Sequence, residues 1–539
     1  MECRSYPLAR MSHASRLLAD YLEDFSRLSD FYVHPPSREG VLEAARRADS
    51  SPRMRGAVAD VLREQNERLG PDPDPSVEQS LERFRNGAAA IVTGQQVGLF
   101  GGPAYTIYKA LGVVRLAEEL TGSGVEGVPI FWMATEDHDL AEVNQCFWAT
   151  HAGFERIDLP FPKEVEGRPV GAVALPEEVV AAVETVCSRL EGPSAPSVAR
   201  ALQESYRPGE TLASAFGRLM RRLFSGRGLL LVDPTDARLR RLAGHLYLGA
   251  LDSCDGFDKE LLARAERLSF DGYHTQVRVT DESTLLFWEI EGRRFPVECR
   301  GGRLHVGGFH FSPGEFRQTL AERPERASGN VLLRPVVQDA LLGTAAYIGG
   351  PAEIAYLAQA EVVYRRLGVP MPAVLARPGF TLVARTLDRL LSKYHLSIAD
   401  VFQGRQHLRA AMERESLPGD LIERFTEGEA KLREILANLR DPLARLDATL
   451  SGALETVERK ILYQYTKLHE KAGRALGARN GILDRHEHLL TDLLHPHHEL
   501  QERALCFLPM LAWQGLPLMD ALERLASPEA GQHIVVSLD

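Results

Sequence analysis

The sequence predicts an α/β fold built on an open parallel sheet, followed by a long helical arm. Short, unbroken apolar segments at 88–92 and 128–134 are typical of strands buried on both faces. The amphipathic stretch 104–120 between them predicts a helix, so that strand, glycine-rich loop, helix and strand form a βαβ unit. Because such apolar segments recur, we expect at least five strands with helices on both faces. The recurring segments are 228–232, 331–333, 345–348 and 372–375.

The pattern divides the chain into three parts. Residues 1–87 show mainly helical periodicity, 88–380 hold the expected sheet core, and 381–539 are mainly helical. Two insertions interrupt the core. The proline-rich stretch at about 150–200 predicts a lobe of loops and helices, and the alternating pattern at about 270–318 predicts a small antiparallel sheet.

The third part predicts a coiled-coil arm. From Leu446 to Leu468, apolar residues recur at alternating steps of three and four, which is typical of a heptad seam. Pro442 can begin a helix but not continue one, so we expect two helices, at about 421–440 and 442–476. The arm could pair within the chain or with a second subunit, and we favour a homodimer. Residues 534–536 suggest a last strand that returns to the core.

Composition excludes several classes of protein. The 539 residues include 63 Lys and Arg against 74 Asp and Glu, a net charge of −11, which argues against nucleic-acid binding. Six scattered cysteines without a Cys-x-x-Cys pair argue against a disulfide framework or a zinc ribbon. There is no signal-peptide pattern, and charged residues interrupt the longest apolar stretch. We therefore expect a soluble cytoplasmic protein without a membrane or nucleic-acid partner.

In open α/β sheets, ligands bind beyond the carboxyl ends of the strands, so the polar residues there are the candidates. The first group is the glycine loop, residues 93–103, with Lys109 in the helix that follows. Its glycines permit close backbone approach, and free amides at a helix start favour an anion. The loop matches neither the dinucleotide-binding nor the Walker pattern, and a tight turn without a ligand is the alternative. The candidates here are Thr93, Gly94, Gln95, Gln96, Gly102, Tyr105 and Lys109.

The second group is the acidic loop, Glu136-Asp137-His138-Asp139, with Asn144 downstream. Three carboxylates and an imidazole could bind an amine, deprotonate it or hold a divalent metal. Because adjacent residues point in different directions, at most two or three can converge. A solvated acidic loop without a ligand is the alternative.

Two further groups follow later strands. Arg334, near Gln338 and Asp339, is a natural anchor for an oxyanion at the sheet edge. The other group surrounds Gly350-Pro351, which is also ordinary chemistry for a helix start. Its candidates are Tyr347, Gly349, Gly350 and Glu353, with Tyr356 beyond. The late histidines at 486–498 lack cysteine or carboxylate partners at ligand spacing, and no metal site is predicted.

The glycine loop and the acidic loop together closely resemble one family, the BshC cysteine ligases of bacillithiol biosynthesis. The resemblance covers nearly the whole chain. It implies a Rossmann-like core with two connecting-peptide insertions and a C-terminal coiled coil used for dimerisation. The matching pattern is Thr93-Gly94-Gln95-Gln96-x-Gly98-Leu99-Phe100-x-Gly102-Pro103-x-Tyr105-Thr106-x-x-Lys109-Ala110, then Pro129-x-Phe131-Trp132-x-Ala134-x-Glu136-Asp137-His138-Asp139.

The implied reaction joins cysteine to glucosaminyl-malate through an amide bond. We expect ATP or another nucleotide to activate the cysteine carboxyl near the glycine loop, although no nucleotide motif is present. On this hypothesis Lys109 and Arg334 stabilise developing negative charge, while Asp137 or His138 deprotonates the amine. Gln95, Gln96 and Asn144 would orient the second substrate.

Two alternatives remain at the level of sequence. One is a non-catalytic protein that binds a nucleotide or an amino sugar, or a scaffold organised by the coiled coil. The other is a metal-dependent hydrolase that uses the acidic loop, Glu136 to Asp139.

Overall fold

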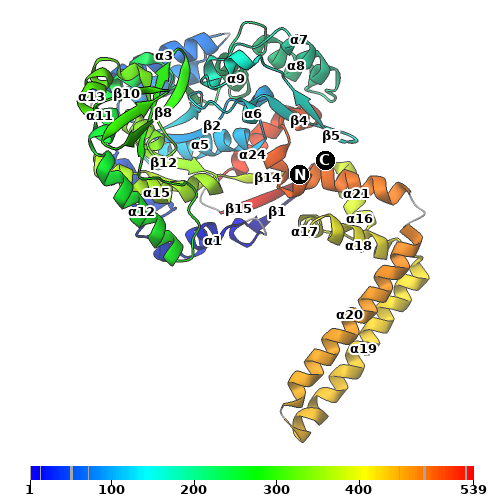
Figure 1. Cartoon of the computed structure of the whole chain (residues 1–539). Helices are drawn as coiled ribbons and strands as arrows, with labels where there is room; N and C mark the ends of the chain where they lie inside the picture. The colour runs from blue at the N-terminus through cyan, green and yellow to red at the C-terminus, as the bar shows by residue number, and fades with distance from the viewer. Residues whose placement is uncertain are drawn as a thin grey trace.

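The central element of the computed structural model is a five-stranded parallel sheet (Figure 1). The structure describes residues 2–11, 14–48, 52–70, 72–447, 449–477, 481–527 and 531–538. The strand order is β13-β12-β2-β3-β6, so the chain starts in the middle and extends to both sides. The strands are β2 (Ala89–Gln95), β3 (Gly127–Met133), β6 (Leu230–Val232), β12 (Thr344–Gly349) and β13 (Ala373–Ala376). The open parallel α/β fold is thus confirmed.

Alternate residues of the strands enter two separate hydrophobic cores, as a period of two requires. Ile91 and Phe131 join the core that contains α5 (Tyr105–Thr121) and α9 (Leu212–Leu223). Val92 and Ile130 join the core on the other face, with residues of α3 (Pro52–Leu69), α4 (Pro75–Arg85) and α15 (Pro351–Leu367). Helices therefore cover both faces, and the carboxyl edge of the sheet is left to loops.

The strand expected at 331–333 is wrong. The strand lies just before it, in β11 (Ala327–Gly329), and pairs antiparallel with an inserted strand. Asn330 then turns the chain, since its side-chain oxygen accepts from the backbone N–H groups of Leu332 and Leu333 at 3.0 and 3.1 Å. Arg334 is consequently the first residue of α14 (Arg334–Leu342), with Pro335 in the first turn.

The first insertion begins with a short helix, α6 (Leu140–Val143), and a hairpin, β4 (Gln145–Thr150) and β5 (Gly153–Asp158). Loops lead to α7 (Val179–Ser188) and α8 (Ala195–Ser205), in agreement with the predicted lobe. After β6 come α10 (Ala237–Leu242), α11 (Gly244–Asp252) and α12 (Cys254–Phe270).

The second insertion is the predicted antiparallel sheet. It contains β7 (Ser283–Ile290), β8 (Arg293–Arg300), β9 (Arg303–Val306) and β10 (Phe309–Phe311), followed by α13 (Pro313–Glu322). The turn between β8 and β9 is Gly301-Gly302, both with positive φ, as expected for glycine. The two insertions meet where the N–H of Arg294 donates to the carbonyl of Gly167 at 3.0 Å.

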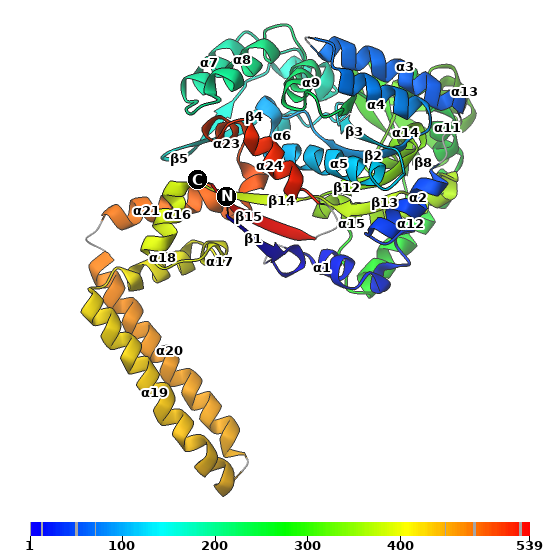
Figure 2. The ribbon, with the colours of Figure 1, turned by 180° about the vertical axis from the view of Figure 1, so that it is seen from behind.

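A third sheet ties the two ends of the chain to the core. β15 (Gln532–Ser537) lies between β1 (Glu2–Pro7), with which it is antiparallel, and β14 (Gly379–Val383), with which it is parallel. The predicted returning strand is therefore confirmed, and it is the middle strand of this sheet (Figure 2). Helices α1 (Arg16–Glu23) and α2 (Arg38–Arg47) follow β1.

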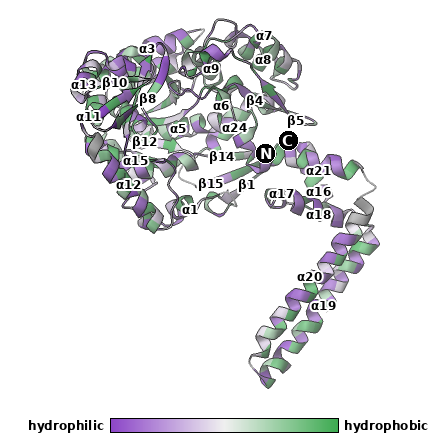
Figure 3. Ribbon diagram, in the orientation of Figure 1, coloured by the Kyte–Doolittle hydropathy of each residue, from purple (hydrophilic) through white to green (hydrophobic). Residues whose placement is uncertain are grey.

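The C-terminal part is helical and extends from the body as an arm (Figure 1). Shorter helices α16 (Arg385–Lys393), α17 (Ile398–Phe402), α18 (Arg405–Glu415) and α21 (Gly481–Leu494) connect the arm to the core. The arm itself is a hairpin of α19 (Gly419–Leu446) and α20 (Leu450–Gly477), which pack on each other within one chain. Both helices mix hydrophobic and hydrophilic residues along their length (Figure 3).

The predicted helix boundary at Pro442 is wrong, because Pro442 lies inside α19. A proline deletes one intrahelical hydrogen bond, but here it precedes only the last turn, on an exposed stretch where water can satisfy the freed carbonyl. The chain ends with α22 (Gln501–Ala504), α23 (Leu508–Gln514) and α24 (Pro517–Leu525) before β15. No helix among the described residues has the length and apolar character needed to span a membrane.

Candidate functional site at the carboxyl edge of the sheet

The glycine loop is shaped by close backbone packing. A side chain on Gly98 would come within 2.9 Å of Gly102 Cα, and one on Gly94 within 3.0 Å of the Trp132 carbonyl. Gly101 and Gly102 adopt positive φ values of 91° and 69°. These glycines are therefore required by the turn itself, whether or not a ligand binds there.

The helix start after this loop is less open than the sequence suggested. The N–H of Ala104 donates to the carbonyl of Leu505 at 2.8 Å, and the N–H of Thr106 to the carbonyl of Pro103 at 2.9 Å. The C-terminal segment thus occupies part of the expected anion site, because amides that already donate have little left to offer a phosphate. Thr93 is likewise occupied, since its hydroxyl donates to the Ile348 carbonyl at 2.7 Å.

Lys109 lies at the centre of a buried network that we define as Lys109, Arg334, Tyr347, Glu353 and Tyr356. Its side chain is only 2% exposed. The ammonium group donates to the Gly94 carbonyl at 2.9 Å and to Gln95 Oε1 at 3.0 Å, and it forms an ion pair with Glu353. These three contacts use all three of its donors.

Glu353 is held by the network as a carboxylate. It accepts from Tyr347 Oη at 2.5 Å and from the N–H of Gly350 at 2.7 Å, which also caps α15. Burial acts to raise the pKa of Glu353, but Lys109 and the Gly350 amide outweigh it and hold the pKa below its usual value. Burial in turn lowers the pKa of Lys109, and the Glu353 carboxylate opposes only part of that effect.

Arg334 completes the network from α14. Its guanidinium donates to Tyr356 Oη at 2.7 Å and to Gln338 Oε1 at 3.1 Å. Burial acts to lower the pKa of Arg334, while Tyr356, Tyr347 and Glu353 raise it above the ordinary value. Lys109 is buried and Arg334 is half-buried, and the donors of both already contact protein groups.

The acidic loop faces the glycine loop directly. Register places Gln95 beside Met133 at the ends of β2 and β3, and Gln96 Nε2 donates to Asp137 Oδ2 at 2.8 Å. Gln96 also donates to Glu142 at 2.5 Å. Asp137 and His138 are 37% and 44% exposed, so they are within reach of a substrate.

The four residues of the acidic loop diverge. Glu136 is buried, with an oxygen 3.3 Å from Arg240, and Thr135 beside it donates to Asp233 at 2.5 Å. Asp139 caps α6 by accepting from the N–H of Ala141 at 3.1 Å. Within the described residues, no three or more His, Cys, Asp or Glu side chains gather as a metal site. Asp137 and His138 are left as the pair facing outward.

The inserted sheet covers this pair from one side. The ring of Phe287 lies 6.0 Å from that of His138, and the Arg294 guanidinium stacks on Phe287 at 3.8 Å. Burial lowers the pKa of Arg294, although Glu136 and Asp137 partly oppose this. The second insertion thus contributes an aromatic ring and a cation to the surroundings of the acidic loop.

Asn144 lies apart from this group. Its side chain donates to the Leu159 carbonyl at 3.2 Å, and its carbonyl accepts from the N–H of Leu159 at 2.8 Å. Both bonds fasten the base of the β4–β5 hairpin. The geometry explains Asn144 as a structural residue, and its predicted contact with substrate stays a prediction.

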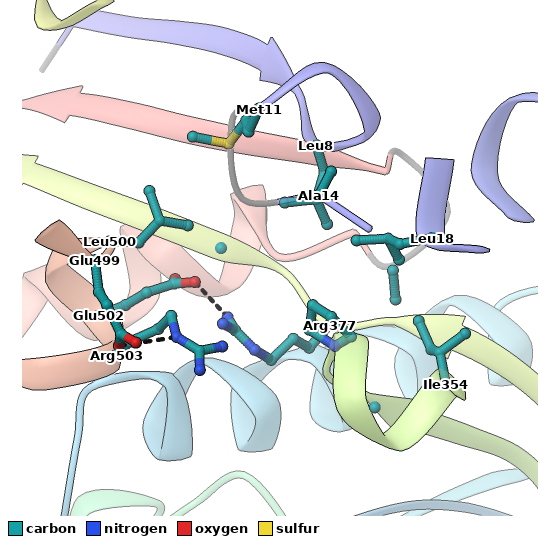
Figure 4. Close-up of a pocket in the computed structure, with 14 residues that line it drawn as sticks. Leu8, Met11, Ala14, Leu18, Ile354, Arg377, Glu499, Leu500, Glu502 and Arg503 are labelled. Carbon is teal, nitrogen blue, oxygen red and sulfur yellow. Dashed lines mark hydrogen bonds and ion pairs between the residues drawn. The ribbon is translucent and has the colours of Figure 1, made fainter. Parts of the chain in front are cut away.

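A cavity of about 330 Å³ opens at the carboxyl ends of β12 and β13 (Figure 4). Gly349 and Pro351 form part of its wall, and Leu8, Met11 and Leu18 supply an apolar side. Arg377 pairs with Glu502 at 2.6 Å, and Arg503 with Glu499 at 3.1 Å.

Sequence reasoning did not select Arg377, Glu502 or Arg503. Arg377 directly follows β13, and a polar residue at the end of an expected strand was the criterion that selected Arg334. The same criterion could therefore have predicted Arg377. Its guanidinium lies 5.1 Å from the ring of Tyr105, whose hydroxyl accepts from Gln95 at 3.0 Å. The cavity is therefore connected to the glycine loop. Glu502 and Arg503 come from the last part of the chain, and nothing local in the sequence assigned them to this edge.

The fold and this edge define a class of protein: an α/β protein of Rossmann-like type with polar groups gathered beyond its strands and a helical arm. The N-terminal Rossmann-like domain model of bacillithiol biosynthesis BshC matches residues 1–378, and its C-terminal coiled-coil domain model matches residues 380–538. The chain belongs to the BshC family.

Relatives agree over nearly the whole length. The chain is 39% identical to a protein of Koribacter versatilis, over 96% of each chain, and 36% identical to one of Solibacter usitatus, again over 96% of each. A Salinibacter ruber relative is 33% identical over 99% of this chain and 98% of its own. All three carry the name "Putative cysteine ligase BshC". A solved arginyl-tRNA synthetase-like structure from Campylobacter jejuni aligns with a TM-score of 0.21 and 11% identity, too weak to support an argument.

Proposed function

We propose that this protein is a ligase of bacillithiol biosynthesis that adds cysteine to glucosaminyl-malate by forming an amide bond. The observation that carries the proposal is the contact between Gln96 and Asp137, which joins the two family motifs at an accessible part of the sheet edge. Membership of the BshC family, whose relatives carry the name of cysteine ligases, supports the same reaction.

Amide formation requires an unprotonated amine. Asp137 is partly exposed and lies beside His138, so either group can accept a proton from the glucosamine amine. Gln96 fixes one oxygen of Asp137, and the backbone N–H of His138 donates to the other at 2.7 Å. Because the carboxylate is held at both oxygens, it is oriented before substrate arrives. Lys109 acts as a positioning residue, since it holds Gly94 and Gln95 at the end of β2, and Arg334 holds Gln338 and Tyr356 of the helices beside it.

The carboxyl of cysteine must also be activated, which ATP or another nucleotide would do by forming a better leaving group. The amides of the glycine loop are largely occupied, whereas the cavity of Figure 4 has an apolar wall, two arginines and a volume within the range of ligand sites. A nucleotide would place its base on the apolar side and its phosphates near Arg377 or Arg503, where they would compete with Glu502 and Glu499 for these arginines.

The direct test is turnover of glucosaminyl-malate and L-cysteine with ATP, followed by mass spectrometry of the product. We expect product from the unaltered protein and nearly none from Asp137→Asn. Arg503→Ala should raise the KM for ATP and leave the KM for glucosaminyl-malate unchanged. Absence of product from the unaltered protein with any nucleoside triphosphate would contradict the proposal.

We also propose a homodimer formed through the arm. The α19–α20 hairpin leaves large apolar side chains exposed, and pairing with a second copy would cover them. They include Ile435 at 58%, Leu439 at 45%, Val457 at 45% and Tyr463 at 57% exposure. Light scattering after size exclusion should give twice the chain mass, and Ile435→Lys with Tyr463→Lys should reduce it to the monomer mass.

A further inference from the structure

One face of the second insertion lies against the acidic loop. Phe287 and Glu289 of β7 share this face with Arg294 of β8, because Glu289 and Arg294 are directly opposite in register and side chains alternate along a strand. The ring of Phe287 lies 6.0 Å from that of His138 in the acidic loop. The face that carries Arg294 is therefore also the face that meets the accessible His138.

A second contact fixes the same arrangement. The carboxylate of Glu289 lies 3.3 Å from the guanidinium of Arg240, and Arg240 lies 3.3 Å from Glu136, the buried first residue of the acidic loop. Arg240 thus balances the carboxylates on the inner side of this face. Arg294, in contrast, forms no ion pair with any residue that the structure describes.

The Arg294 guanidinium is held in place but has donors left. Nε donates to the Ser328 hydroxyl at 3.0 Å and Nη2 to the Gly329 carbonyl at 2.6 Å, and the group stacks on the Phe287 ring at 3.8 Å. The residue is half-buried, and its Nη1 atom has no hydrogen-bond partner among the described residues and is still reached by solvent. An oriented guanidinium with free, accessible N–H groups is suited to binding a carboxylate.

The groups on the two sides of Phe287 favour a ligand with charges of both signs. Asp137 and His138 are accessible acceptors for an amine, and Arg294 offers N–H groups to a carboxylate. Under the proposed function the amine belongs to glucosaminyl-malate, whose malate part carries carboxylates. Cysteine fits Arg294 less well, because its carboxyl is the group that is activated and consumed.

We propose that Arg294 binds a malate carboxylate of glucosaminyl-malate while Asp137 and His138 hold its amine, and that Arg294 thereby determines the specificity for an acidic amino sugar. This inference rests on the proposed ligase function and assigns one part of its substrate to a residue. The second insertion then supplies substrate recognition, and the acidic loop at the sheet edge supplies the proton acceptor.

The test is calorimetry of the full-length protein with two amines: glucosaminyl-malate, and the methyl glycoside of glucosamine, in which a methyl group replaces the malate. The unaltered protein should prefer glucosaminyl-malate by about tenfold or more, the usual effect of a charged hydrogen bond. Arg294→Met should remove most of this preference and leave the KM for cysteine unchanged. Arg294→Lys keeps the charge without the fork of donors, should lose part of the preference, and gives the same readout if the Met variant does not fold.

Arg293→Met is the matched control. Arg293 is exposed and precedes Arg294 on the opposite face of β8, so its substitution should leave the affinity for both amines unchanged. An unchanged preference in Arg294→Met, or an equal loss of preference in Arg293→Met, would overturn the inference. So would a loss of affinity for both amines in equal proportion, because Arg294 would then only support the fold.

The same measurements separate this inference from the proposed function. If glucosaminyl-malate binds through Arg294 but no amide product forms, the ligase reaction is wrong and the carboxylate site stands. If product forms and Arg294→Met keeps the ordinary KM for glucosaminyl-malate, the ligase reaction stands and the role of Arg294 is wrong.

Discussion

Glu353 and Asp137 are carboxylates beyond neighbouring parts of one sheet edge, but their surroundings differ. Glu353 is 18% exposed and is held by Lys109, Tyr347 and the Gly350 amide. Asp137 is 37% exposed, and its carboxylate accepts from Gln96 and from backbone N–H groups of its own loop and lies 3.9 Å from His138 Nδ1. The comparison teaches that similar residue patterns after strands serve two purposes: the buried network holds the edge together, and the acidic loop remains available for chemistry.

The largest effect is expected from a substitution of Asp137. If it accepts the proton of the attacking amine, Asp137→Asn should lower kcat by about 100- to 10,000-fold. The midpoint of thermal unfolding should barely change, since the side chain is partly exposed. Steady-state turnover and a melting curve on the same preparation check both parts. A variant with ordinary kcat would show that Asp137 belongs to a solvated acidic loop without a catalytic role.

Glu353→Gln should have the opposite profile. Removing one partner of a buried ion pair leaves the other charge uncompensated, which costs about 3–5 kcal/mol of unfolding free energy. Urea unfolding monitored by circular dichroism measures the loss. Lys109→Met with Glu353→Gln removes both charges and should recover part of the stability. If Glu353→Gln is as stable as the unaltered protein, the network has no structural role.

Asp339, a third carboxyl near this edge, allows a test through the pH dependence of stability. Burial raises its pKa to about 6, although Tyr364 and Gln338 donate to it. A carboxyl whose folded pKa exceeds its unfolded value costs stability as pH rises, and the cost is complete above the folded pKa. As the pH rises from about 4 to 7, the free energy of unfolding of Asp339→Asn should therefore increase relative to that of the unaltered protein by up to roughly 3 kcal/mol. Urea unfolding at both pH values checks this; a constant difference would show that Asp339 ionises normally.

The smallest effect is expected at Asp139, which belongs to the same tetrapeptide as Asp137 but only caps α6. Asp139→Ala should cost about 1 kcal/mol or less, the usual value of a helix cap, and change kcat less than a few-fold. The same turnover assay provides the measurement. A loss as large as that of Asp137→Asn would mean that the whole loop acts as one unit.

Much of the fold followed from local patterns. The strands at 88–92 and 128–134 and the inserted antiparallel sheet were predictable because burial on both faces and alternation leave different patterns. The strand at 331–333 failed because Leu332 and Leu333 are equally suited to a buried helix start, and the decisive feature is the side-chain bond of Asn330.

The candidate site was predictable to a smaller extent. The proximity of Gln96 and Asp137 follows from the parallel order of β2 and β3. The enclosure of Lys109 does not, since it depends on Glu353, far along the chain. The contact between Leu505 and the start of α5 depends on the last part of the sequence, and no local pattern announces it.

The position of β15 has a consequence for how the protein is made. Among the described residues, β1 pairs only with β15 in its sheet, and β15 is synthesised long after β1. During translation β1 must therefore wait with an unpaired edge, which is a known risk for aggregation. The third sheet can be completed only after every segment between β1 and β15 has been synthesised.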